Sequence, residues 1–346
     1  MKPELEKLCQ DFISNRDAVG KAFRWDNSAL HTVCANIFCA HGETADTERL
    51  KECRRIIRDS TGFLSKFRSR KVRSVLAAML SLEDQPEDRM TQANAYFRLL
   101  KRQFKGSEYL VLTAFLLADL ADQTLTEETI SRGKEIYARM NRQHRILTDK
   151  TDSVFAMLMA FSGKTAEELT DETEACYQAL KKKFSSGGSQ TAAQVFSMAG
   201  GTPEEKTQRV TALYDALKEA EIKYGHSSEL APLAALSLAD TPLSVLTEEI
   251  KEADEFLKTQ TGFTGSKEAD QAQRAMYAVM IVSDQYAGTE QVNITVMTNT
   301  IDMLIAKQQA SRISIFMNLL QFAVKLLPEE KEQPEEERKQ DDAPAK

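Results

Sequence analysis

Residues 165–184 of this chain read TAEELTDETEACYQALKKKF. The first four have the spacing of a helix capping box, because the Thr165 hydroxyl and the Glu168 carboxylate can each accept a hydrogen bond from the other residue's backbone N–H. Later residues recur at intervals of three or four and form one mostly apolar stripe: Leu169, Thr173, Cys176, Tyr177, Leu180 and Phe184. The stretch predicts an amphipathic helix that buries this stripe against neighbouring helices.

The same start signal occurs elsewhere in the chain. Thr202-Pro203-Glu204-Glu205 repeats the capping-box spacing, with proline at the first helical position, where its missing N–H is tolerated. Thr124-Leu125-Thr126-Glu127 fits the same template. Acidic residues in these first turns also oppose the positive end of the helix dipole, so acidic pairs such as Glu167-Glu168 indicate helix starts rather than acid–base catalysis.

Two sets of markers recur along the chain with a period of about forty residues. One is a short break between helices, at Gly42, Asp84, Asp122, Gly163, Gly201, Asp240 and Asp284. The other is an apolar anchor near a helix end, at Ile57, Leu100, Met140, Leu180, Leu217 and Leu257. The two sets interleave, which is typical of tandem helical hairpins that bury their apolar faces only against their neighbours.

We therefore predict an all-α fold, an α-α superhelical, solenoid-like stack of about seven helical hairpins with N- and C-terminal capping helices. Each predicted hairpin starts with a helix rich in Ala, Leu and Met and continues into a more charged one. The first helices are expected at 28–40, 72–82, 109–120, 153–161, 192–199, 228–239 and 269–283. Residues 1–327 would form a single helical-repeat domain, with a helix at 311–327 closing the open end.

Two segments stand apart from the regular pattern. Residues 185–189, Ser-Ser-Gly-Gly-Ser, are the softest point, either an inter-repeat loop, which we favour, or a hinge between two half-arrays. Residues 328–346 carry eight acids and four bases but few apolar side chains, which predicts a disordered charged tail. Because this tail holds much of the net charge of −7, the body is nearly balanced, which disfavours general nucleic-acid binding.

A seven-residue resemblance supports duplication within the chain. Residues 57–63 (IRDSTGF) resemble residues 257–263 (LKTQTGF), at a separation of 200 residues. Gly62 and Gly262 each stand where a helix end needs a left-handed residue, and the phenylalanine that follows can fold back onto the last turn.

Composition points to a cytoplasmic protein. The first 23 residues are too charged for a secretory signal, and the longest apolar stretch is too short to span a bilayer. The five cysteines have no framework spacing, and free thiols in a reducing compartment are the simplest interpretation. We expect no membrane association.

Few residues suggest chemistry. His31, Cys34, Cys39 and His41 invite a zinc interpretation, but a helix would place His31 and His41 about 15 Å apart, and buried thiols are common in helices of this composition. No established catalytic or nucleotide-binding motif is present. We therefore assign no catalytic, cofactor-binding or metal residues and expect no cofactor.

Two other features have a structural and a functional interpretation. The basic run Lys66, Arg68, Arg70, Lys71 and Arg73 could bind phosphate or an acidic peptide, but a solvated loop is favoured. Trp25, the only tryptophan, is interpreted as a core residue rather than as a platform for stacking a ligand.

The opening Phe23-Arg24-Trp25 with Ser28 and His31, the Ala/Leu-rich helix that follows, and Thr61-Gly62-Phe63 resemble an uncharacterised bacterial family, domain of unknown function 4003. The similarity would cover most of residues 1–327. It implies a soluble helical protein and supplies no activity or catalytic residues.

Three functional hypotheses remain. The repeats and the missing catalytic constellation favour a non-catalytic scaffold that binds a protein or peptide partner. The alternative is a closed α/α ring that acts as an enzyme or binds a small ligand, for which paired inward carboxylates would be diagnostic. An RNA-reading helical repeat is weaker still, because the recurring positions are apolar or capping residues.

Overall fold

The computed structural model describes residues 1–70, 72–118, 126–148, 152–162, 164–227, 229–263 and 269–286. Within them the chain forms fourteen α-helices, one short 3-10 helix and no β-strand. The prediction of an all-α fold is confirmed. The predicted helix at 311–327 and the predicted tail at 328–346 lie outside the described residues.

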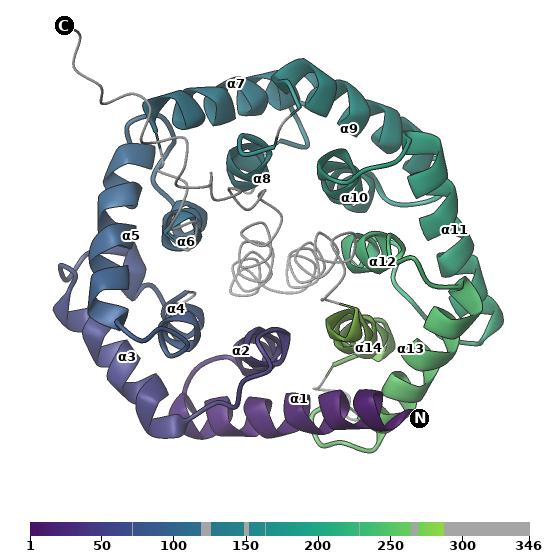
Figure 1. Ribbon diagram of the computed structural model, residues 1–346, viewed down its shortest axis with the longest axis horizontal. Coiled ribbons are helices and arrows are strands. Elements are labelled where there is room, and N and C mark those ends of the chain that lie inside the picture. Colours follow the sequence, from purple (N-terminus) through teal and green to yellow (C-terminus); the bar gives the residue numbers. More distant parts are fainter. Residues whose placement is uncertain are drawn as a thin grey trace, which may run out of the picture.

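The helices alternate between an outer and an inner layer (Figure 1). The outer layer contains α1 (Pro3–Ala22), α3 (Thr47–Asp59), α5 (Pro86–Leu100), α7 (Glu127–Gln143), α9 (Ala166–Leu180), α11 (Pro203–Glu219) and α13 (Leu243–Lys258). The inner layer contains α2 (Ser28–Ala40), α4 (Arg73–Leu80), α6 (Glu108–Leu117), α8 (Asp152–Met159), α10 (Ser186–Met198), α12 (Leu230–Leu236) and α14 (Gln271–Gln285). The 3-10 helix η1 (Lys66–Arg68) lies in the connection between α3 and α4.

The described helices close into a ring. Helix α1 packs against α13 and α14 as well as against α2 and α3, and α14 also contacts α2 (Figure 1). We expected the first helix to cap one end of an open stack. Instead it joins the last described pair of helices to the first, because the apolar stripe of α1 is covered from both sides.

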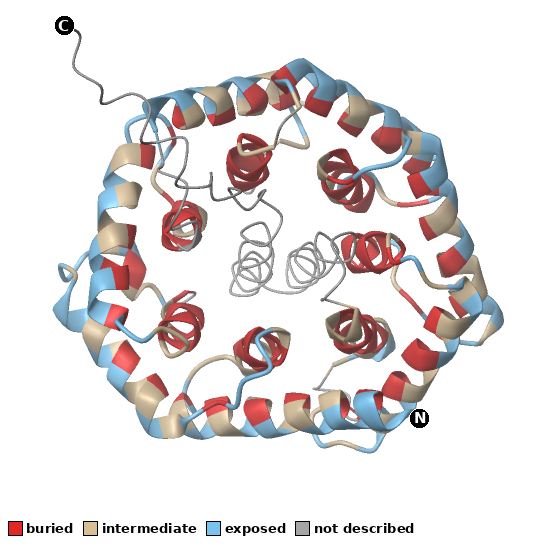
Figure 2. Ribbon diagram, in the orientation of Figure 1, coloured by how far each residue is buried: buried red, intermediate tan, exposed pale blue. Residues whose placement is uncertain are grey.

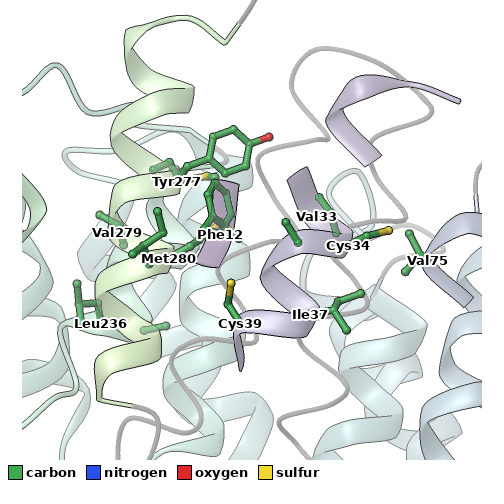
Figure 3. Packing of buried hydrophobic residues seen from close by; sticks show 14 of the residues in the cluster. Phe12, Val33, Cys34, Ile37, Cys39, Val75, Leu236, Tyr277, Val279 and Met280 are labelled. Atoms are coloured by element: carbon green, nitrogen blue, oxygen red, sulfur yellow. The ribbon is translucent and has the colours of Figure 1, made fainter. Parts of the chain in front are cut away.

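Aromatic packing fills this junction. Phe12 of α1 is fully buried and projects between α14 and α2 (Figure 3). Its ring centroid lies 6.0 Å from that of Tyr277 on α14 and 6.5 Å from that of Phe263, which follows α13. Ion pairs add to the contact, since Lys2 Nζ lies 2.7 Å from a carboxylate oxygen of Glu249 on α13.

The two layers differ in composition because they differ in surroundings. Inner helices are enclosed by neighbours and are buried nearly all round, as in α4, where every residue after Arg73 is buried, and in α8, where every residue is buried (Figure 2). Outer helices bury one stripe and expose the other side to water. The six repeated anchors are all buried on outer helices, as predicted: Ile57, Leu100, Met140, Leu180, Leu217 and Leu257.

The packed pairs begin one helix earlier than we expected. Six of the seven inner helices have their most extensive contact with the outer helix that precedes them, as in α1–α2 and α9–α10. Helix α12 is the exception, because it packs most extensively on α10. The sequence paired each Ala-rich helix with the charged helix that follows it. These two helices make much less contact, because the outer helix that follows an inner one packs against the next inner helix around the ring.

Most of the predicted helix starts are confirmed. Complete capping boxes join Thr165 to Glu168 and Thr202 to Glu205. At α7 the cap is Thr126, two residues beyond the predicted Thr124, which lies outside the described residues. Residues 186–189 are the first turn of α10 and Ser185 is its N-cap, so this segment is part of a helix rather than a loop.

The two related segments at 57–63 and 257–263 have diverged in structure. Gly262 has a φ of +96° and Phe263 is buried, as expected for a helix end of this kind. Gly62 does not adopt a positive φ, and the Phe63 side chain is 85% exposed. The prediction for Gly62 and Phe63 was therefore wrong. The physical reason is that Phe263 packs against Phe12 of α1 at the closure, whereas no such partner covers Phe63.

Candidate interaction surface at the basic end of the ring

Inner helices begin side by side at one end of the ring. Arg73, at the start of α4, donates a hydrogen bond of 2.8 Å to Asp26, which precedes α2. The backbone N–H of Ser185, before α10, donates to the carbonyl of His226, before α12. The connections that lead from outer to inner helices therefore gather at this end. We call it the basic end, formed by residues 23–27, 60–70, 72, 101–107, 144–148 and 181–185.

Four adjacent connections at this end carry bases and no acid among their described residues. Their ten basic side chains are Lys66, Arg68, Arg70, Lys101, Arg102, Lys105, Arg145, Lys181, Lys182 and Lys183. Three of them pair with acids of neighbouring helices: Lys66 with Glu108, Arg102 with Glu127, and Lys183 with Asp215. Each group follows the C-terminus of an outer helix, where a cation is favoured by the helix dipole. The opposite end, where outer helices begin, is acidic around α3 and α5, with Glu43, Asp46, Glu83 and Asp84.

Large apolar side chains are exposed at the same end. Trp25 is 77% exposed, Phe63 85%, Leu64 90% and Ile146 98%. Apart from the N-terminal Met1, these are the only exposed large apolar side chains among the described residues. Isolated exposed apolar residues are ordinary on protein surfaces. Their restriction to one end of the ring, among basic residues, makes that end the candidate interaction surface.

Asp26 fixes the connection that carries Trp25. Its carboxylate is nearly inaccessible and lies 2.8 Å from Arg73 and 3.1 Å from Arg54, while Ser74 donates a hydrogen bond to it. Burial alone would raise the pKa of Asp26, but the hydrogen bonds from Ser74 and Arg73 and the nearby positive charges outweigh it, so the pKa is lowered. Arg24 stacks over the Trp25 ring, with its guanidinium carbon 4.5 Å from the centroid.

The connection at 60–72 is anchored on both sides of its exposed tip. Arg68 donates hydrogen bonds to the carbonyls of Arg58 and Thr61, which ties η1 to the end of α3. Phe67 is buried and packs edge-on against Phe97, with 5.5 Å between the ring centroids. Phe63 and Leu64 therefore stand out from a fixed base.

The connection that begins at residue 144 is also anchored on both sides of its exposed side chain. The His144 ring lies 4.4 Å from the Tyr177 ring, and its Nε2 is within hydrogen-bond distance of Glu174 on α9. The Thr148 hydroxyl donates to the carbonyl of Met140 on α7. Ile146 lies between these two anchors and is almost wholly exposed.

Sequence reasoning found only part of this surface. It identified the basic run, whose described members are at this end, but interpreted Trp25 as a core residue, which is wrong. The ring closes without Trp25 because the neighbouring Phe23 is the buried residue of that connection. Leu64 and Ile146 were not identified, although each is a large apolar residue in an otherwise polar, basic connection.

The residues considered for zinc are dispersed. His31 Nε2 lies 3.1 Å from the Phe23 carbonyl oxygen, and His41 Nδ1 lies 2.8 Å from that of Ile37. Cys34 and Cys39 are buried on α2, and burial raises the pKa of both thiols. Across the part of the chain that the structure describes, no three His, Cys, Asp or Glu side chains are placed to share a metal ion.

A buried charge cluster holds the opposite end together. Lys206 Nζ is almost inaccessible, pairs with Glu172, and donates hydrogen bonds to the carbonyls of Phe196 and Ala199 at the end of α10. Lys164 pairs with the other Glu172 oxygen at 2.5 Å. Because these charges are consumed by contacts within the ring, the cluster has a structural role, and the basic end remains the candidate surface.

None of the described helices combines the length and the apolar character needed to cross a membrane.

Comparison with known proteins places the chain in a family. The sequence profile described as "Protein of unknown function (DUF4003)" matches residues 15–310, and the chain belongs to this family. It is 22% identical over 183 residues to "Uncharacterized protein YeaA" of Bacillus subtilis (strain 168). That match covers 51% of this chain and 55% of the relative, so it spans about half of each. No solved structure matches the chain.

Proposed function

We propose that this member of the family is a non-catalytic scaffold, built from about seven tandem helical hairpins closed into a ring, that attaches to its partner through the basic end. The observation that supports it is the coincidence, at one end, of ten bases and of the exposed Trp25, Phe63, Leu64 and Ile146. Exposed apolar side chains within a charged surface are typical of interaction sites.

The local structure supports attachment rather than catalysis. The exposed side chains are held in place by Asp26, by Arg68 and Phe67, and by His144, whose imidazole is engaged by Glu174 and packs on Tyr177. A fixed surface loses little conformational entropy when a partner binds.

A closed ring was the architecture of the alternative hypothesis, an enzyme or small-ligand binder, which called for paired inward carboxylates. On the described inner helices, Asp152 is approached instead by two amides, since Gln190 and Gln194 each donate a hydrogen bond to its Oδ1. These two hydrogen bonds join α8 to α10 and give Asp152 a structural role, so we favour the scaffold.

The test compares three forms of the full chain as bait in a native extract. The second form neutralises three exposed bases at the basic end (Arg70→Gln, Lys105→Gln, Lys182→Gln), and the third neutralises three exposed acids at the other end (Asp84→Asn, Glu87→Gln, Asp88→Asn). We expect the wild type and the acid variant to recover the same protein or membrane material and the base variant to lose it. Equal recovery by all three forms would refute the proposal.

A further inference from the structure

The basic end offers separate projecting side chains rather than a groove. Phe63 and Leu64 lie in the connection between α3 and α4, and Ile146 in the one between α7 and α8. The connection between α5 and α6 lies between them in ring order and carries Lys101, Arg102 and Lys105. A bound peptide normally covers a continuous line or groove of the receptor. An extended, fluid surface can accept several separated projections at once.

We propose that the partner of the basic end is the surface of an anionic phospholipid bilayer, an inference that rests on the proposed function. Trp25, Phe63, Leu64 and Ile146 enter the interfacial layer, and the surrounding lysines and arginines contact the acidic headgroups. The ring binds the membrane at its surface and does not span it, and this inference replaces the sequence-based expectation of no membrane association.

Charge complementarity favours this partner. The described residues of four connections provide no acid and ten bases, three of which pair with acids of neighbouring helices. Bases near an anionic bilayer strengthen binding by about fivefold each. The acidic residues Glu43, Asp46, Glu83 and Asp84 lie at the opposite end, directed away from the headgroups in this orientation. The ring therefore has one orientation in which attraction is greatest.

The types of the exposed side chains also fit a bilayer. Tryptophan prefers the interfacial region, where its apolar body and its N–H are both satisfied. Phe63, Leu64 and Ile146 have no polar atom in the side chain and lose solvent contact favourably in the acyl boundary. Since their connections are anchored by Phe67 and His144, insertion orders little additional chain.

The single tryptophan provides a direct measurement, because Trp25 is the only one in the chain and lies at the proposed contact. The full chain would be mixed with phosphatidylcholine vesicles, with and without about one third phosphatidylserine. Binding would be measured by co-sedimentation and insertion by Trp25 emission. We expect binding only with phosphatidylserine, a shift of emission to shorter wavelength, and weakening at high salt.

Two variants of exposed residues separate the two components of binding. The base variant Arg70→Gln, Lys105→Gln, Lys182→Gln should bind about a hundredfold more weakly, as expected for three lost bases. Phe63→Ser with Leu64→Ser should weaken binding at least tenfold and reduce the emission shift. The acid variant Asp84→Asn, Glu87→Gln, Asp88→Asn should bind like the wild type. Circular dichroism checks that all the variants remain folded.

The failures can be told apart. Absence of wild-type binding to phosphatidylserine vesicles, equal binding by the base variant, or binding without any change in Trp25 emission would overturn the lipid inference. If vesicles fail but poly-L-glutamate or an RNA oligonucleotide binds the wild type and not the base variant, the occupant is an acidic protein or RNA and the scaffold proposal stands. If no probe distinguishes the base variant and the extract experiment also fails, both proposals fall.

Discussion

Removing the aromatic ring of Phe12 should destabilise the whole ring, although Phe12 lies in the first helix of the chain. The side chain is fully buried, and its ring lies 6.0 Å from that of Tyr277 and 6.5 Å from that of Phe263. Truncating a buried phenylalanine to alanine costs about 3–5 kcal/mol, because transfer energy is lost and a cavity remains. Two aromatic contacts are lost together, so we expect about 4 kcal/mol for Phe12→Ala.

The measurement is equilibrium unfolding in urea followed by far-ultraviolet circular dichroism. Phe63→Ala is the matched control, because the same ring is removed where it is exposed, and its effect should be within about 0.5 kcal/mol. In a closed ring α1 has packed neighbours on both sides, so Phe12→Ala should lower the urea midpoint of the main unfolding transition. In an open stack α1 would be a terminal helix that frays alone.

The reasoning would be refuted by two results. One is a loss of less than about 1 kcal/mol for Phe12→Ala, close to the control. The other is a separate early transition with the main midpoint unchanged, accompanied by proteolysis confined to α1. Either would show that the contacts of α1 with α13 and α14 do not couple the two ends of the described ring.

Three further predictions use matched pairs or pH. Asp26→Asn should lower the free energy of unfolding by about 2 kcal/mol at pH 7, because Arg54 and Arg73 lose a buried carboxylate. Since the pKa of Asp26 is lowered in the folded state, this difference is fully present above the usual carboxyl pKa of about 3.9 and disappears as the pH falls through the folded pKa. Urea titrations of both proteins at pH 7 and at pH 3 measure the change. Gly262→Ala should lower the free energy of unfolding by about 1–2 kcal/mol because of its φ of +96°, whereas Gly62→Ala should leave it unchanged or raise it slightly. Equal shifts of the urea midpoint for the two variants would contradict the structure. Gly188→Ala should cost about 2 kcal/mol of stability, because an added Cβ would lie 2.0 Å from the Ser227 carbonyl oxygen. Gly187→Ala, which meets no such atom, should stabilise α10 by up to about 1 kcal/mol. Thermal unfolding of both variants tests this pair, and tolerance of Gly188→Ala would exclude the close approach of α10 to the residues before α12.

The local signals in the sequence were reliable because they depend on a few neighbouring residues. Thr165 and Thr202 cap their helices as predicted, since a capping box needs only four residues. The repeated anchors are buried because a period near forty reports which face of each outer helix meets its neighbours. All of these follow from sequence spacing alone.

Closure of the ring could not be predicted in the same way. Whether a helical array stays open or closes depends on the small rotation between successive pairs, summed around the whole array, and no single motif encodes that rotation. The segments at 57–63 and 257–263 show the consequence. Their sequences are similar, yet Phe263 is buried and Phe63 exposed, because α1 reaches one of them and not the other.

The helix dipole explains part of the basic end but not all of it. Cations are favoured at the C-terminus of any helix, so bases after α3, α5, α7 and α9 do not by themselves indicate a partner. However, the connections after α11 and α13 follow helix ends of the same kind and include acids, Glu221, Glu229 and Asp270. Among the described residues, connections that carry bases without acids are therefore confined to those after α3, α5, α7 and α9, beyond what the dipole requires.

The exposed apolar side chains have no such local explanation. A helix end gains nothing from a leucine or phenylalanine in water, and Phe263 shows that a phenylalanine of this motif can be buried when a neighbouring helix covers it. Phe63, Leu64 and Ile146 remain exposed although the residues on either side of them are anchored to the ring. Their exposure among the bases is what the dipole cannot account for, and it gives the emission of Trp25 on anionic vesicles its value as the decisive measurement.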